Sequence, residues 1–221
     1  MEFPQWVTDR VIARQGCLHP YDKLIPQRTA FVIIDMQNYY TQPGYMGECG
    51  QARATFPVVN RLATALREVG GHVIWVQTCA DGATEFWSHH HTHMLTPSRS
   101  ARRLRELAND SEGFQIAPGL HPAPEDARVI KRYFSALVPG SSDLNEVLKA
   151  QKITHVLVGG TATNVCCEST ARDLMMMDYA TIMVEDALSA MTRLEHDQSL
   201  YNWMLFFGDV LCADEVIARL L

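Results

Sequence analysis

The chain has 221 residues, 47 % of them hydrophobic, and its 25 acidic residues outnumber 19 basic ones, which gives a net charge of −6 at pH 7. A chain of this length and apolar content can bury a sizeable core, but its charge has the wrong sign for a nucleic-acid partner. No apolar run reaches the roughly 20 residues that a membrane span needs, and the first residues lack the basic start and apolar stretch of a secretory signal. We therefore expect a cytoplasmic protein without a nucleic-acid or membrane partner, whose six cysteines, free of any CxxC spacing, are reduced thiols.

Strands and helices alternate from residue 29 onward. The first 28 residues are expected to form an arm over the surface of a single domain that spans residues 29–221. A continuous apolar run at 29–35 predicts the first strand. Residues 56–71 predict a helix, because apolar side chains recur every three to four positions before a glycine pair, and residues 72–78 predict the second strand.

The segment between residues 79 and 126 is the longest irregular part of the sequence. It contains a histidine-rich stretch at 79–98, a basic helix at about 100–107 and a loop with three prolines. A loop of this length is more often functional than idle. The spacing of its arginines favours the solvated face of a helix over a site for phosphate or carboxylate; these residues are Arg99, Arg102, Arg103 and Arg105.

The alternation then continues to the end of the chain. Strands are predicted at residues 127–133, 154–160, 179–187 and 209–212, and helices at residues 141–152, 164–178, 195–208 and 213–221. Apolar strands separated by helices predict a parallel sheet that is covered on both faces and joined by right-handed crossovers. We expect a three-layer α/β/α domain, whose ligand site lies beyond the carboxyl ends of the strands.

Three candidate catalytic residues follow strands at this edge. Asp35 ends the first strand, Lys131 ends the third, and Cys166 opens the helix after the fourth. Each alone is compatible with a structural role, but an acid, a cation and a thiol at one edge indicate catalysis. A free cysteine is only a few per cent thiolate at neutral pH, and a helix N-terminus and a lysine favour its ionisation while Asp35 takes the proton. The unpaired N–H groups of the helix start are natural donors to an oxyanion.

The helix pattern distinguishes the two adjacent cysteines. Cys167 recurs with Ala171, Leu174 and Met175 on a stripe that is expected to pack on the sheet. Cys166 is turned about 100° away from that stripe. We therefore predict that Cys166 is the nucleophile and that Cys167 is a core residue.

Three motifs in order, IIDMQ, VIKRYFSA and GTATNVCCESTARD, resemble the isochorismatase-like cysteine hydrolases. This family includes nicotinamidase, N-carbamoylsarcosine amidohydrolase and ureidoacrylate amidohydrolase, and the resemblance covers roughly residues 28–212. It implies a six-stranded parallel sheet in the order 3-2-1-4-5-6 and a triad that cleaves C–N bonds, here Asp35, Lys131 and Cys166. It further implies a cis peptide bond between Thr161 and Ala162, an oxyanion hole made by the backbone N–H groups of Ala162 and Cys166, and a homo-oligomer, dimer or tetramer.

The resemblance implies a cysteine-dependent amidohydrolase without a cofactor. Its substrate would be a small amide, N-carbamoyl or ureido compound that passes through a thioester and releases ammonia or an amine. The stretches at residues 41–50 and 159–170 look closer to the ureidoacrylate type than to nicotinamidase. The alternatives are a nicotinamidase-like reaction, an isochorismatase-type reaction that uses no cysteine nucleophile, and a catalytically silent binding or scaffold protein.

Polar and aromatic side chains beside these motifs are candidate substrate contacts, although packing is the alternative for the aromatic ones: Gln37, Tyr39, Tyr40, Trp87, His91, Tyr133 and Phe134. The stretch HHHTH at His89–His93 invites a metal site. Nicotinamidases of the family bind a metal through Asp-x-His, and here Ala83 follows Asp81 where that histidine is required. We therefore expect no metal, and a lid over the pocket or a solvated loop instead.

Overall fold

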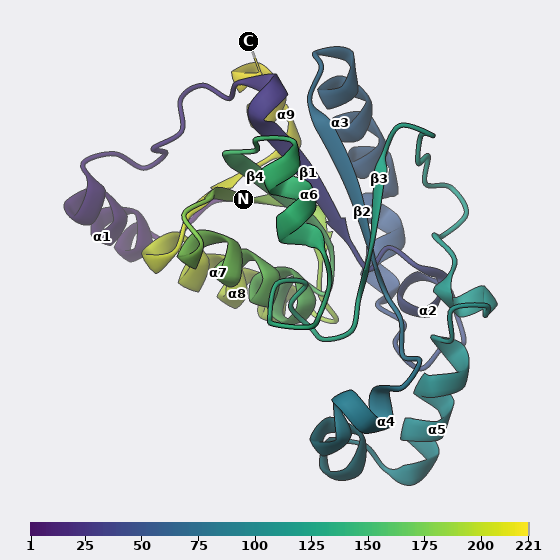
Figure 1. The fold of residues 1–221 in the computed structure, drawn as a ribbon. Helices are drawn as coiled ribbons and strands as arrows, with labels where there is room; N and C mark the ends of the chain where they lie inside the picture. The colour runs from purple at the N-terminus through teal and green to yellow at the C-terminus, as the bar shows by residue number, and fades with distance from the viewer. Residues whose placement is uncertain (221) are drawn as a thin grey trace.

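Six parallel strands form one sheet in the computed structural model, which describes residues 1–220 (Figure 1). Their order is β3-β2-β1-β4-β5-β6, which confirms the expected sheet. The strands are β1 Thr29–Ile34, β2 His72–Thr78, β3 Ala127–Lys131, β4 His155–Thr161, β5 Ala180–Ser189 and β6 Asp209–Leu211. Every neighbouring pair is parallel, so all carboxyl ends meet at the same edge.

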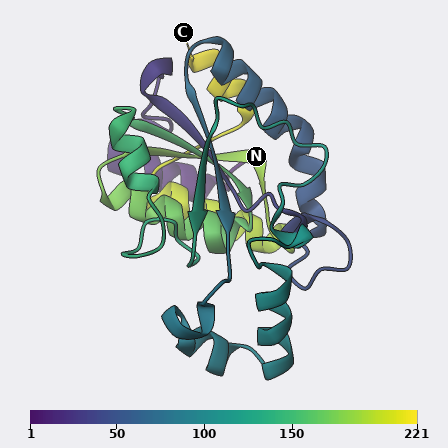
Figure 2. The ribbon, with the colours of Figure 1, turned by 45° about the vertical axis from the view of Figure 1, so that its right-hand side comes forward.

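Helices cover both faces of the sheet (Figures 1 and 2). One face carries α3 Phe56–Glu68 and α9 Ala213–Arg219, and the other carries α1 Gln5–Gln15, α6 Leu144–Ala150, α7 Glu168–Met176 and α8 Arg193–Phe206. In β1, Phe31 and Ile33 pack toward α3 while Val32 and Ile34 pack toward α7 and α8. All six residues of β1 are buried, as expected of a central strand covered on both sides.

The amino-terminal segment contains a helix that the sequence pattern did not predict. Helix α1 packs against α8 and buries Val7 and Val11 within the core on that face of the sheet. Only these two of its eleven residues are buried, and so narrow an apolar stripe gives a weak periodic signal. No helix among residues 1–220 combines the length and the apolar character that a bilayer crossing requires.

Residues 79–114, which we call the cap, extend beyond the carboxyl ends of β1 and β2 (Figures 1 and 2). The cap contains α4 Ala83–Phe86, the π-helical turn η3 His90–Met94, α5 Pro97–Glu106 and the 3₁₀ turn η4 Glu112–Phe114. The Ala80 N–H donates to the Leu107 carbonyl at 2.9 Å, which closes the cap at its base. Two short elements, α2 Asn38–Thr41 and the 3₁₀ turn η2 Gly50–Thr55, follow β1 beside it.

The basic face of α5 is not uniformly solvated, and the expectation of a solvated face was wrong for one residue. Arg99 and Arg105 are exposed, but the Arg103 side chain is only 5 % exposed. The helix also begins earlier than predicted, because Pro97 occupies its first turn and the Thr96 hydroxyl accepts a hydrogen bond from the Arg99 N–H at 3.3 Å.

Strands β1 and β4 approach each other closely at Gly160, which pairs with Ile34. Gly160 has φ +114°, and a Cβ added to it would lie 2.0 Å from the Ile34 carbonyl oxygen. A side chain at this position would therefore push apart the two strands whose ends carry Asp35 and the loop of Cys166.

We predict that Gly160→Ala lowers the free energy of unfolding by more than about 3 kcal/mol, because strain and backbone overlap act together. Gly140→Ala is the matched control, since Gly140 has φ +80° but nothing within 4 Å of an added Cβ; it should cost about 1–2 kcal/mol. Urea unfolding of both variants measures the difference. If both variants lose the same free energy of unfolding, the close approach of the two strands at Gly160 makes no separate contribution to the cost.

Candidate active site

Asp35 and Lys131 form a fully buried ion pair at the carboxyl edge of the sheet. Asp35 follows β1 with φ +57°, and its N–H donates to the Val76 carbonyl at 2.9 Å. Lys131 ends β3, two strands away, and its Nζ lies 3.0 Å from Asp35 Oδ2. Both side chains are 0 % exposed. The long lysine side chain thus spans β2 and joins the acid at the end of β1.

Thr78, the last residue of β2, lies between the two partners. Lys131 Nζ donates to Thr78 Oγ1 at 2.6 Å and to the Tyr133 carbonyl at 3.0 Å, and the Thr78 hydroxyl donates to Asp35 Oδ1 at 2.7 Å. Asp35 Oδ2 accepts no hydrogen bond of good geometry. Sequence reasoning missed Thr78, although its place at the end of the intervening strand was a usable signal.

The electrostatics of the pair keep the lysine charged. Burial lowers the pKa of Lys131, but the negative charge of Asp35 outweighs it, so that the pKa is raised above its usual value. Lys131 therefore carries a fixed positive charge at neutral pH.

Cys166 lies in the π-helical turn η5 Thr163–Cys167 and is 4 % exposed. Burial raises the pKa of its thiol to about 12; the charge of Asp35 adds to this rise, and Lys131 opposes it. The resting thiol is therefore protonated, although the helix start and the lysine were expected to favour the thiolate. Burial, together with the nearby carboxylate, outweighs both.

The wide turn at η5 shapes the backbone around Cys166. The Thr161–Ala162 peptide bond is cis, the conformation that the resemblance implies. The Ala162 carbonyl accepts hydrogen bonds from the N–H groups of Val165 at 3.1 Å and Cys167 at 3.2 Å, but not from that of Cys166. The bond to Cys167 spans five residues, a geometry that is frequent at functional sites.

Cys166 opens into a cavity of about 250 Å³ between the sheet edge and the cap. Thr161 and Ala162 line it beside Cys166, and the cap contributes Arg99 and Arg103 among others. A cavity of this volume holds about eight waters at roughly 30 Å³ each, so it suits a molecule with a similar number of heavy atoms.

Comparison with known proteins identifies the family. A family model described as the isochorismatase domain matches residues 29–215. The chain belongs to the isochorismatase family. It is similar to a protein from Cronobacter sakazakii named ureidoacrylate amidohydrolase RutB, with 32 % identity over 197 residues, which is 83 % of this chain and 84 % of that protein.

Solved structures agree with this assignment. A cysteine hydrolase from Pseudomonas syringae pv. phaseolicola superposes with a TM-score of 0.79 at 27 % identity, over 89 % of this chain and 94 % of that chain. A nicotinamidase/pyrazinamidase from Bacillus subtilis shares the fold, with a TM-score of 0.71 at 21 % identity over 83 % of this chain and 99 % of that chain. The predicted family is confirmed, and the chain is a hydrolase.

Three of the seven candidate substrate contacts line the cavity of this isochorismatase-family site, namely Tyr39, Tyr40 and Phe134. The other four do not line it. The Gln37 amide donates to the carbonyls of Thr78 at 3.0 Å and Phe114 at 2.9 Å, and so ties the end of β1 to β2 and the cap. Its side chain is fully buried in this network, so we no longer assign it to the substrate.

The remaining three candidates support the cavity wall from behind. The Tyr133 hydroxyl donates to the Phe86 carbonyl at 2.9 Å, and the Trp87 ring stacks on the His90 ring at 4.2 Å between centroids. His91 is 5 % exposed and hydrogen-bonded to Ser100 at 2.8 Å. Spacing along the sequence could not distinguish this supporting layer from the wall itself.

The histidines of HHHTH point in different directions. His90 lines the cavity, His91 is buried within the cap, and the rings of His89 and His93 lie 4.9 Å apart. Within residues 1–220, no group of three or more His, Cys, Asp and Glu side chains could hold a metal ion.

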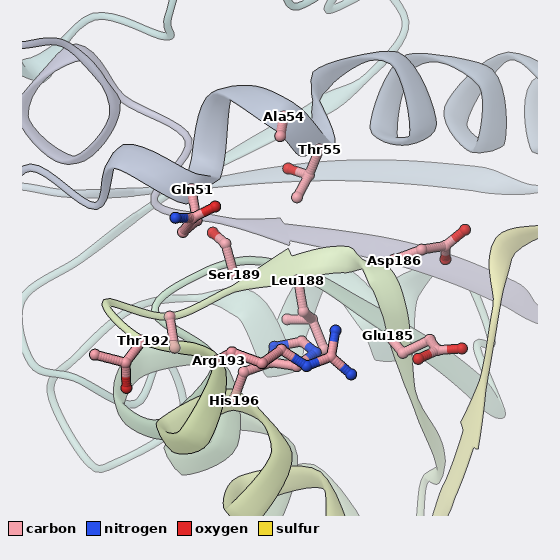
Figure 3. Close-up of a pocket in the computed structure, with 11 residues that line it drawn as sticks. Gln51, Ala54, Thr55, Glu185, Asp186, Leu188, Ser189, Thr192, Arg193 and His196 are labelled. Atoms are coloured by element: carbon pink, nitrogen blue, oxygen red, sulfur yellow. The ribbon is translucent and has the colours of Figure 1, made fainter. Parts of the chain in front are cut away.

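A larger cavity of about 340 Å³ lies between η2, the end of β5 and the start of α8 (Figure 3). It contains none of Asp35, Lys131 and Cys166. His196 lies on the α8 side of this cavity, and its Nδ1 is 2.9 Å from Thr163 Oγ1 at the start of η5. Burial, with a smaller effect of Arg193, lowers the pKa of His196 to about 4, so a neutral His196 braces the turn that carries Cys166.

We predict a pH-dependent stability contribution from His196. The unfolded histidine binds a proton below about pH 6.5 and the folded one below about pH 4, so its contribution is lost as the pH falls through this window. The advantage of the parent chain over His196→Gln should shrink by up to about 3 kcal/mol between pH 6.5 and 4. Urea unfolding at several pH values measures it, with His93→Gln, an exposed cap histidine, as the control. If the stability difference between the parent chain and His196→Gln stays constant between pH 6.5 and 4, the lowered pKa of His196 is contradicted.

Proposed function

We propose that the chain is a cysteine amidohydrolase that cleaves a C–N bond of a small amide, N-carbamoyl or ureido compound. The observation that carries this proposal is a thiol at a cavity wall within electrostatic reach of a buried Asp–Lys pair. The name of the Cronobacter sakazakii relative supports a ureido substrate.

The reaction begins with proton transfer from Cys166 to Asp35. The raised thiol pKa excludes a substantial resting thiolate, so the proton must leave as substrate binds. Asp35 Oδ2 accepts no hydrogen bond, although Lys131 Nζ lies 3.0 Å from it, and this oxygen is the proposed acceptor. Once Asp35 is neutral, the charge of Lys131 stabilises the new thiolate.

The thiolate then attacks the substrate carbonyl. The backbone N–H groups of Ala162 and Cys166 stabilise the oxyanion, a contribution worth about 10²- to 10³-fold in rate per donor. The C–N bond breaks, and the proton held by Asp35 goes to the departing nitrogen, which leaves as ammonia or an amine. Asp35 next takes a proton from water, whose attack on the Cys166 thioester releases the acid and restores the thiol.

The alternatives fit the site less well. An isochorismatase-type reaction would leave Cys166 without a role, and a silent scaffold would leave a filled triad beside an open cavity without one. A nicotinamidase-like reaction uses the same residues and differs in the substrate, so a substrate panel decides between the two.

We further propose a cytoplasmic homo-oligomer, as is common in the family. Large apolar side chains are exposed where α1 meets α8: Trp6 and Phe206 are each at least 50 % accessible, and both lie within 6.0 Å of the Arg10 guanidinium. Apolar groups gathered in this way are typical of surfaces that associate. Light scattering of the purified chain determines the number of subunits, and a monomer at all concentrations would contradict the proposal.

We predict that Cys166→Ala lowers kcat for ammonia release by at least about 10⁴-fold, because no nucleophile remains. Cys167→Ala removes the neighbouring, fully buried thiol and should retain kcat within about threefold, with a stability loss of about 1 kcal/mol. The panel comprises nicotinamide, biuret, N-carbamoyl amino acids and 3-ureidoacrylate. Full activity in Cys166→Ala, or silence of the parent chain on every compound, would overturn the proposed function.

A further inference from the structure

Helix α5 presents a buried arginine to the catalytic cavity. Arg103 is 5 % exposed and lines the same cavity as Cys166. No carboxylate within residues 1–220 lies within 4 Å of its guanidinium, whereas its neighbour Arg102 pairs with Glu106 and the partly buried Arg67 pairs with Asp126. Buried charges are almost always paired, so Arg103 lacks the partner that its position demands.

The side chains around Arg103 orient it without neutralising it. Its Nη1 lies 3.4 Å from His91 Nε2, and its guanidinium stands over the Trp87 ring at 5.7 Å. Burial and then the charge of Arg103 lower the pKa of His91, which is therefore neutral. Because Nε2 faces the arginine, the proton belongs on Nδ1, which donates to the Ser100 hydroxyl at 2.8 Å. The guanidinium is thus fixed in place with its charge uncompensated.

The cavity as a whole is positive. Its lining includes Arg99 and Arg103 and no aspartate or glutamate. Asp35, the carboxylate of the triad, is already paired with Lys131. The cavity therefore carries an excess of positive charge in a poorly solvated space, where this charge attracts an anion more strongly than it would in water.

We propose that Arg103 binds a carboxylate of the substrate, so that the enzyme acts on small anionic amides or ureido acids in preference to neutral amides. This inference rests on the proposed function, and it names the substrate class of that site. The planar guanidinium fork suits a carboxylate, to which it donates two parallel hydrogen bonds. The exposed Arg99 attracts the anion toward the cavity, and the volume of about 250 Å³ leaves room for one carboxylate and one scissile group.

The first experiment measures binding without turnover. Calorimetric titration of Cys166→Ala with 3-ureidopropionate and with its methyl ester compares an anion with a neutral analogue. Adding Arg103→Gln should weaken binding of the acid by about 10- to 100-fold, the range for charge-assisted hydrogen bonds, and should change binding of the ester less than threefold. Arg105→Gln removes the same charge from an exposed position outside the cavity and is the matched control. Arg103→Lys keeps the charge but not the fork and should fall between.

The second experiment measures ammonia release in chains that retain Cys166. The parent chain should hydrolyse the acids 3-ureidoacrylate, 3-ureidopropionate or succinamate with a kcat/KM at least tenfold above that of the corresponding methyl ester. Arg103→Gln should remove this preference mainly by raising KM. Far-UV circular dichroism and the melting temperature verify that the variant folds, and if it does not, Arg103→Lys gives the same test with a smaller expected change.

The outcomes separate this inference from the proposed function. Acid and ester hydrolysed equally well, with a rate that depends on Cys166, would overturn the role of Arg103 and leave the amidohydrolase intact. If no compound releases ammonia, the proposed amidohydrolase function is contradicted. The binding experiment then still tests whether Arg103 binds a carboxylate. If Arg103→Gln and Arg105→Gln weaken binding of the acid equally, the effect comes from the overall charge of the protein, and the proposal is overturned.

Discussion

The buried ion pair between Asp35 and Lys131 is the constraint on which the rest of the site depends. Removing two such charges from water costs several kcal/mol each, and only close approach and hydrogen bonds repay it. The pair meets this demand at 3.0 Å with Thr78 as the bridging hydroxyl. This arrangement requires β2 between β1 and β3, with all three strand ends at one edge, as the parallel sheet provides. Fold and chemistry are therefore linked through one buried pair.

The pair also acts on the protonation of Cys166. Burial raises the pKa of the thiol most, the charge of Asp35 adds to the rise, and Lys131 opposes it. A protonated resting thiol fits the proposed proton transfer from Cys166 to Asp35 on substrate binding. A thiol in this form is also protected from oxidants and alkylating agents, because the thiolate is the reactive form. The positive charge of Arg103 at the cavity is consistent with a substrate that brings its own negative charge.

Local sequence pattern was sufficient for most of the sheet. The predicted range of β2 agrees with the structure at both ends, and the order of all six strands followed from the family motifs. Asp35, Lys131 and Cys166 could be selected because each follows a strand at the same edge. The resemblance also implied the cis bond at Thr161–Ala162 that the structure contains.

What the sequence could not predict depends on distant contacts. In the sequence, Thr78 resembles any other strand residue. Its role depends on the pairing of β2 with β1 on one side and with β3 on the other. In the sequence, Arg103 is indistinguishable from the other arginines of a solvated helix face. In the folded cap it is buried, and Trp87 and His91 contact it rather than line the cavity. The direction of the thiol pKa likewise depends on how completely Cys166 is buried. Each of these depends on contacts between residues far apart in the sequence, which periodicity does not encode.

The most direct test of the proposed site is the titration of the Cys166 thiol. Thiolate absorbance near 240 nm, recorded for the parent chain and for Cys166→Ala, isolates this cysteine from the other five. We expect almost no thiolate from Cys166 up to about pH 10, two units below a pKa of about 12, and a titration displaced to lower pH in Asp35→Asn. One full equivalent of Cys166 thiolate at pH 7 in the parent chain would contradict it.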